Sequence, residues 1–116
     1  MSITAKTHAD FARRVARGTK WLDKNHKGWA QKIAVSSLDM AEGPSCVLGQ
    51  MFGGFWHAID DLKLLTIAQS QHLGFVFSDE HDTPECWSAL TELWLLRIRR
   101  RQRYIRNEKF NEEVSQ

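Results

Sequence analysis

Arginine is concentrated near the end of the chain, where the segment 97–106 holds six arginines among ten residues. The planar guanidinium group donates several N–H groups in a fork that suits phosphates and carboxylates alike. On a helix, three of these arginines share one face: Arg99, Arg103 and Arg106. The other three project from other faces: Arg97, Arg100 and Arg101. The spacing therefore predicts a basic surface that can bind an anionic partner.

Charge is divided unevenly along the chain, although the net charge is only +2. Residues 1–32 carry eight Lys and Arg against two acids, and residues 33–96 carry one Lys against nine acids. Residues 97–116 carry seven basic residues against three acids. Arg13 and Arg17 lie in the first basic region, so we count them as candidate binding residues beside the C-terminal arginines. The acidic middle can attract both basic ends in the fold.

Four environments would suit the arginine-rich segment. A nucleic-acid backbone would bind with an affinity that falls steeply with salt, because bound phosphates release counterions. An acidic surface on another protein would use the same N–H donors, and a solvated helix end would complement the helix dipole. The chain also has acids of its own in one loop: Asp79, Glu80 and Asp82. We expect a protein partner, with nucleic acid as the alternative, because the acidic middle would repel a phosphate backbone.

Residues that could bind a metal or catalyse a reaction are few. Four of them could in principle bind zinc, although their spacing matches no zinc signature: Cys46, His57, His81 and Cys86. His57 lies four residues before Asp61, which places an imidazole beside a carboxylate on a helix, but this spacing is common by chance. No nucleotide-binding glycine loop, serine-hydrolase motif or zinc-protease motif occurs. We therefore expect no catalytic site, no metal, no cofactor and two reduced cysteines.

The most apolar part of the chain is the segment 45–59. At helical spacing its apolar residues run nearly all round the cylinder, which predicts a buried central helix capped by Ser45. Gly49 and Gly53 lie on one face of that helix, and a glycine in a helix interior is unfavourable unless something packs close to it. We expect another backbone to pack against these two glycines.

Three further helices are expected around the central one: 8–25, 67–73 and 84–108. Thr7 is expected to cap the first, Thr66 with Gln69 matches a capping box for the second, and Thr83-Pro84 opens the third. Gly74 suits the left-handed residue that follows a helix end. A small two-stranded pair is a further option, formed by residues near Val35 and 75–77.

Four motifs carry a resemblance to a known group: Gly18-x-x-Trp21-Leu-Asp23, Gly28-Trp29, Cys46-Val-Leu-Gly-Gln-x-Phe-Gly53 and Leu73-Gly-Phe75. In these motifs, which span about residues 15–95, the chain resembles small uncharacterised proteins from actinobacteria and their bacteriophages. The Cys-Val-Leu-Gly-Gln block is the most specific part. The resemblance implies no activity. It implies a phage or mobile-element gene whose product acts in a bacterial cytoplasm, and the arginine-rich segment lies outside it.

These observations predict a mainly α protein, a compact helical bundle around a buried central helix. Its 116 residues suit one domain, with flexible tails at 1–6 and 109–116. No apolar run is long enough to cross a membrane, and the first residues lack the apolar block of a signal peptide, so we expect a cytoplasmic protein. The expected function is non-catalytic: a phage or mobile-element accessory factor that binds a host protein. The alternative is a small nucleic-acid-binding protein, and the oligomeric state stays open.

Overall fold

The computed structural model describes the backbone of residues 3–115 and the side chains of residues 3–103. Four α-helices follow one another along the chain: α1 (Ala5–Asn25), α2 (Val47–Phe52), α3 (Ile67–His72) and α4 (Pro84–Ser115). Three short 3₁₀ turns and one π-helical turn lie between them: Trp29–Lys32, Val35–Ser37, Asp79–His81 and His57–Asp61. The expected mainly α fold is confirmed. None of the described helices is long and apolar enough to cross a membrane.

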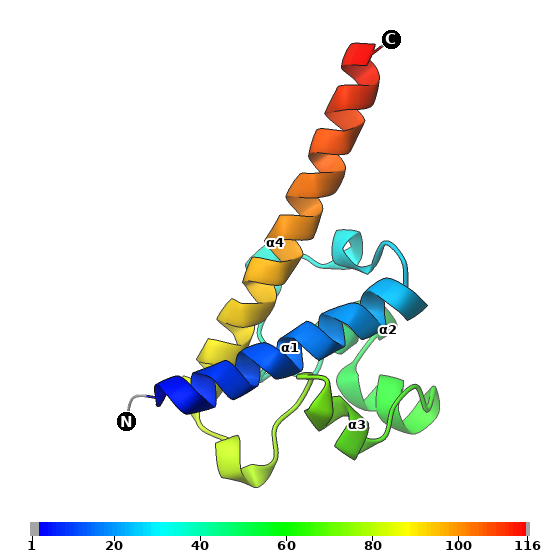
Figure 1. The fold of residues 1–116 in the computed structure, drawn as a ribbon. Helices are drawn as coiled ribbons and strands as arrows, with labels where there is room; N and C mark the ends of the chain where they lie inside the picture. Colours follow the sequence, from blue (N-terminus) through cyan, green and yellow to red (C-terminus); the bar gives the residue numbers. More distant parts are fainter. Residues whose placement is uncertain (1–2, 116) are drawn as a thin grey trace.

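The two long helices, α1 and α4, cross each other, and the shorter elements pack beside them (Figure 1). Their contact is centred on Trp94, whose side chain is fully buried. The Trp94 ring stacks on Phe75 at a centroid distance of 5.2 Å and meets Trp29 edge to face at 6.0 Å. Its indole N–H donates to the carbonyl of Gly74 at 2.8 Å. Trp94 therefore joins α4 to α1, to the 3₁₀ turn at Trp29 and to the segment after α3.

Glycine at position 18 allows this crossing. A Cβ atom there would lie 3.0 Å from Cζ2 of Trp94 and would also meet the carbonyl of Leu73. The missing side chain thus lets α1 approach both neighbours closely. Gly74 has φ 75°, as expected for the residue after α3, and its α-carbon faces the backbone of Arg14 and Val15 in α1.

Both long helices extend beyond the predicted boundaries. α1 begins at Ala5 rather than at residue 8, because the hydroxyl of Thr4, and not that of Thr7, accepts from a first-turn amide (3.1 Å, from Thr7). α4 begins at Pro84 as predicted, and the hydroxyl of Thr83 accepts from the amide of Cys86 at 3.2 Å. Its backbone stays helical to Ser115 rather than ending near 108, since no Gly or Pro interrupts that stretch. The expected flexibility of 1–6 and 109–116 stays a prediction.

The predicted central helix over 45–59 is wrong as one element. α2 stops at Phe52, and Gly53 and Gly54 adopt φ of 86° and 137°, which only glycine takes readily. Their amides both donate to the carbonyl of Gly49, at 3.0 and 2.9 Å, which closes the helix. A separate turn of helix follows, in the π form over His57–Asp61. The bundle is therefore organised around the crossing of α1 and α4.

Gly49 and Gly53, which the sequence placed on one packed face, have different roles. A Cβ atom at Gly49 would lie 2.9 Å from the backbone of Pro44, so the predicted close approach is confirmed there. At Gly53 a Cβ atom would meet nothing within 4 Å, so that prediction is wrong. The cap also differs: the sulfur of Cys46, and not Ser45, accepts from the amide of Gly49 at 3.2 Å.

The short helix α3 agrees closely with its prediction. The hydroxyl of Thr66 accepts from the amide of Gln69 at 3.0 Å, and the Gln69 side chain accepts from the amide of Thr66 at 2.9 Å. This is the expected capping box. The optional two-stranded pair is absent from the described residues, because 35–37 forms a 3₁₀ turn and 75–77 has no strand partner.

Candidate functional site

Arg101 is committed to the fold and does not face outward as a binding residue. Its Nε donates to Oδ1 of Asp23 at 2.9 Å, and its terminal nitrogen donates to Oδ2 at 2.6 Å, a two-pronged ion pair between α4 and α1. Asp23 also accepts from the indole N–H of Trp29 at 2.8 Å. The guanidinium of Arg101 is the main reason that the pKa of Asp23 lies below its usual value. The guanidinium also lies 5.8 Å from the centroid of the Trp29 ring.

The alternative in which the arginines pair with this chain's own acidic loop is not seen among the described side chains. Asp82 instead accepts from the indole N–H of Trp87 at 2.8 Å, and Oε1 of Glu80 lies 4.0 Å from Nε2 of His81. The acid that pairs with the arginine-rich segment is Asp23, which lies on α1. This choice follows from the crossing of the two long helices.

The remaining described arginines of the segment gather on one exposed part of α4. Arg99, Arg100 and Arg103 are exposed, and Arg97 is half-buried. Leu96 lies among them with 66% of its surface exposed, more than any other large apolar side chain within residues 3–103. We call this set the arginine surface: Leu96, Arg97, Arg99, Arg100 and Arg103. Within residues 3–103, no carboxylate lies within ion-pair distance of its four arginines.

Two hollows flank Leu96, one on each side of α4. The first, of about 280 Å³, lies between α1 and α4 and is lined by seven residues: Ala12, Val15, Leu93, Leu96, Arg97, Arg100 and Arg103. The second, of about 670 Å³, opens toward the 3₁₀ turn that contains Gln31 and is lined by five residues: Gln31, Leu96, Arg99, Gln102 and Arg103. Leu96 and Arg103 belong to both hollows. Arg99 and Arg103 line the second hollow together, as expected for two residues on the same face of a helix.

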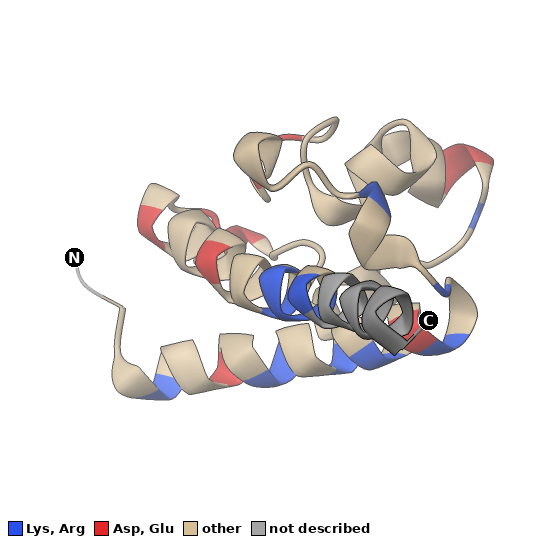
Figure 2. Cartoon of the chain, turned by 90° about the horizontal axis from the view of Figure 1, so that it is seen from above, with Lys and Arg blue, Asp and Glu red and all other residues tan. Residues whose placement is uncertain are grey.

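The other predicted site residues lie elsewhere or outside the described side chains. Arg13 is exposed on α1, 3.9 Å from Asp10, and lines neither hollow. Arg17 donates from Nε to the carbonyl of His72 at 3.0 Å, which ties α1 to the end of α3. The side chain of Arg106 falls outside the described residues. Figure 2 shows basic residues at intervals along α1, and a further basic group on α4.

Gln102, which the sequence did not single out, fixes the orientation of the arginine surface. Its side-chain amide donates to two carbonyls of the 3₁₀ segment, those of Ala30 at 2.9 Å and Ile33 at 3.1 Å. Gln102 thus holds this turn of α4 against the segment after α1, while Arg101 holds it against Asp23 in the last turns of α1. Sequence reasoning missed this role of Gln102, because a single glutamine among arginines forms no spacing pattern that predicts a hydrogen bond to backbone carbonyls.

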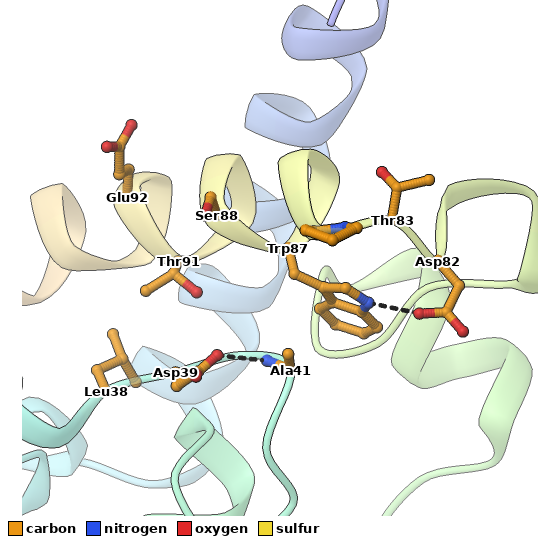
Figure 3. A pocket seen from close by; sticks show the side chains of 10 residues that line it. Leu38, Asp39, Ala41, Asp82, Thr83, Trp87, Ser88, Thr91 and Glu92 are labelled. Atoms are coloured by element: carbon orange, nitrogen blue, oxygen red, sulfur yellow. Dashed lines mark hydrogen bonds between the residues drawn. The ribbon is translucent and has the colours of Figure 1, made fainter. Parts of the chain in front are cut away.

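A larger groove, of about 790 Å³, lies at the opposite end of α4 and was not predicted from the sequence. Figure 3 shows Trp87 and Thr91 pointing from α4 toward the segment that contains Asp39 and Ala41. The Thr91 hydroxyl accepts from the amide of Met40 at 3.0 Å, and Asp39 accepts from the amide of Ala41 at 3.0 Å. Three carboxylates line the groove: Asp39, Asp82 and Glu92. Its lining has hydroxyls and carboxylates but no imidazole or thiol, so it presents no nucleophile with a histidine base.

The cysteines and histidines are dispersed. Cys46 and Cys86 are both buried and free, and burial is the main reason that the pKa of the Cys46 thiol is raised. His57 and Asp61 do meet, at 2.8 Å between Nδ1 and Oδ2, but both side chains are exposed on the surface. No group of three or more potential metal ligands occurs within the described part of the chain.

Comparison with known proteins supplies no relative for this chain. It matches no protein-family model, and no curated protein or solved structure is significantly similar to it. What this chain binds is therefore inferred from the geometry of the arginine surface and its hollows.

Proposed function

We propose that this chain is a non-catalytic binding protein that engages another protein through the arginine surface of α4. The observation that carries the proposal is the exposure of Leu96 among four arginines. Single exposed leucines are common, but arginine together with a large apolar side chain is typical of protein-binding surfaces. A protein partner can cover Leu96 and offer carboxylates to the guanidinium groups at the same time.

The biological setting is part of the same proposal. The resemblance to small actinobacterial and bacteriophage proteins supports a phage or mobile-element accessory factor that acts in the cytoplasm of a bacterial host. A host protein is then the natural partner, because an accessory factor without catalytic groups acts by occupying a surface of another molecule.

Nucleic acid is the second candidate, favoured by the density of arginine on one part of α4. Arg99, Arg100 and Arg103 could each contact a phosphate, and such binding would weaken steeply as salt increases. Two features favour protein over nucleic acid. A phosphate backbone offers nothing apolar to cover Leu96, and the first half of α4 carries the acidic groove, which would repel a duplex lying along the helix.

A pull-down from nuclease-treated bacterial lysate tests the proposal. The tagged wild-type chain is compared with the triple variant Arg99→Gln, Arg100→Gln, Arg103→Gln, and with Arg13→Gln as a control that removes an exposed arginine from α1. We expect a specific protein to be retained by the wild type and by the control, and to be lost with the triple variant. Retention of the same protein by the triple variant contradicts the proposal. Salt-sensitive binding to DNA or RNA that the triple variant abolishes would favour the nucleic-acid alternative.

A further inference from the structure

We infer that the arginine surface receives an acidic amphipathic α-helix of the partner, a conclusion that rests on the proposed function. The inference follows from the shape of the hollow between α1 and α4, from the spacing of the arginines on its rim, and from the place of Leu96 between them.

The floor of this hollow is apolar. Ala12 and Val15 of α1 and Leu93 and Leu96 of α4 line it, and its volume is about 280 Å³. Sites that enclose a drug-sized ligand start at about 300 Å³ and are more closed than a hollow between two helices. The dimensions instead suit apolar side chains presented by another protein, which would cover the exposed part of Leu96.

The rim of the hollow carries charge at a helical repeat. Arg97, Arg100 and Arg103 are three residues apart, so along the axis of α4 they are separated by about 4.5 Å and span about 9 Å. Carboxylates three or four residues apart on a second helix repeat at nearly the same distance. A helix that packs its ridges along this row crosses α4 at a shallow angle of about 20°. An extended strand, by contrast, places successive same-face side chains about 6.6 Å apart, a longer repeat than the helical one.

The occupant must offer both carboxylates and an apolar side chain, because the surface combines arginines with Leu96. Arginine pairs strongly with carboxylates when both can form two-pronged hydrogen bonds, and this pairing is strengthened where water is excluded. An apolar side chain seated beside Leu96 excludes water from the neighbouring guanidinium groups. An occupant that is only anionic leaves Leu96 exposed, whereas an occupant that is only apolar leaves Arg100 and Arg103 without partners in the interface.

The acidic groove at the start of α4 is a poor occupant of this surface, were a second copy of the chain to present it. Three carboxylates, Asp39, Asp82 and Glu92, line this groove and are not arranged along one exposed helix face. Two of the three already accept hydrogen bonds, Asp39 from the amide of Ala41 and Asp82 from the indole of Trp87. Self-association through other acidic residues would compete with the partner helix for the arginine surface.

Fluorescence anisotropy with the full chain and labelled peptides tests the inference. The main probe is a synthetic helical peptide that carries glutamates at i, i+3 and i+7 and leucines at i+4 and i+8. Three further probes are a scrambled peptide of the same composition, a peptide with the leucines replaced by alanine, and a single-stranded DNA oligonucleotide. The protein variants are Leu96→Ser, the triple variant Arg97→Gln, Arg100→Gln, Arg103→Gln, and the control Arg13→Gln. Circular dichroism and thermal melting verify that every variant folds.

We expect the amphipathic peptide to bind the wild type and the Arg13→Gln control equally. Leu96→Ser and the triple variant should each weaken its binding at least about tenfold, and so should scrambling the peptide or removing its leucines. Three results overturn the inference: Leu96→Ser changes the affinity less than twofold, the DNA binds more tightly than the peptide, or the peptide fails to bind at about 1 mM. A dimer that Leu96→Ser converts to a monomer, measured by light scattering, also overturns it in favour of a second copy.

These results are separable from a failure of the proposed function. If the peptide does not bind but a lysate protein is still lost with the arginine variant, the function stands and only the helical, acidic nature of the partner is wrong. If the amphipathic peptide binds as expected but no lysate protein depends on the arginine surface, the recognition chemistry stands and the proposed host-protein function is wrong.

Discussion

The two halves of α4 contact the rest of the protein in different ways. In the first half every fourth residue is buried: Cys86, Leu90, Trp94 and Ile98. Beyond Ile98 the described contacts are polar and peripheral, namely the ion pair of Arg101 and the backbone contacts of Gln102, while Arg99, Arg100 and Arg103 remain exposed. One helix thus contributes apolar burial to folding at one end and charge at the other. Substitutions of the buried residues of α4 should therefore change stability, and those of its exposed arginines should change binding.

Trp94→Ala is expected to have the largest effect, because it removes the residue on which both long helices pack. Deleting a fully buried tryptophan should lower the free energy of unfolding by about 3–5 kcal/mol. Trp94→Phe keeps a ring but leaves the carbonyl of Gly74 without its donor, which should cost about 1–3 kcal/mol. Urea denaturation followed by circular dichroism measures both. A loss below about 1 kcal/mol for Trp94→Ala would contradict the described core.

Gly18→Ala is expected to have the second-largest effect, lowering the free energy of unfolding by about 1–3 kcal/mol because the core is overpacked. The new methyl group would lie 2.9 Å from the nearest ring atom of Trp94 and against the carbonyl of Leu73, neither of which can move without disturbing the crossing. Gly43→Ala is the matched control, because a Cβ atom there meets nothing within 4 Å and φ is not positive. Equal stability of the two variants in the same denaturation assay would show that α1 and α4 do not approach each other as described.

Asp23→Asn should have a smaller effect that depends on pH. Both partners of the Asp23–Arg101 pair are partly exposed, so at neutral pH the loss should be about 0.5–1 kcal/mol. The pKa of Asp23 is lowered in the folded protein, so the ionised form stabilises the fold above the unfolded pKa, near 4. This contribution is lost as the pH falls through the lower, folded pKa. The difference in unfolding free energy between wild type and Asp23→Asn should therefore shrink below about pH 4; a difference that grows on acidification would contradict the pairing.

The arginine surface should give the smallest change in stability. The triple variant Arg99→Gln, Arg100→Gln, Arg103→Gln should unfold within about 0.5 kcal/mol of wild type, because these side chains are exposed, and yet lose its partner. Arg101→Gln should show the opposite behaviour: a loss of about 0.5–1 kcal/mol with the partner retained. Parallel denaturation and pull-down measurements would show whether the two roles of α4 are separate. A triple variant that unfolds well before Arg101→Gln would show that they are not.

Local chemistry in the sequence determined three of the helix boundaries, namely the two ends of α3 and the start of α4. The capping box of Thr66 and Gln69, the Thr83-Pro84 start of α4 and the left-handed Gly74 all depend on atoms within a few residues of one another. The mainly α character followed in the same way, from apolar spacing along the chain. These features could be predicted because their energetics do not depend on distant segments.

The break in the expected central helix could not be predicted in the same way. Gly53 and Gly54 are compatible with a helix interior packed against another backbone and equally with a left-handed turn, because glycine adopts both conformations readily. The apolar residues around them fit either arrangement. A hydrogen bond between two segments decides between them. The amide of Phe55 donates to the carbonyl of Gly43 at 3.0 Å, and a continuous helix would keep these two residues apart.

For the candidate site, the sequence by itself determined that a dense group of arginines lies on one helix and that Arg99 and Arg103 share a side of it. Only the tertiary structure decided which of these arginines take part in the fold. Arg101 meets Asp23 across 78 positions of sequence, and Arg97 and Arg100 border the hollow beside Ala12 and Val15. Both outcomes depend on where α1 crosses α4. That crossing is determined by the packing of Gly18 and Trp94, which the local pattern of charges does not predict.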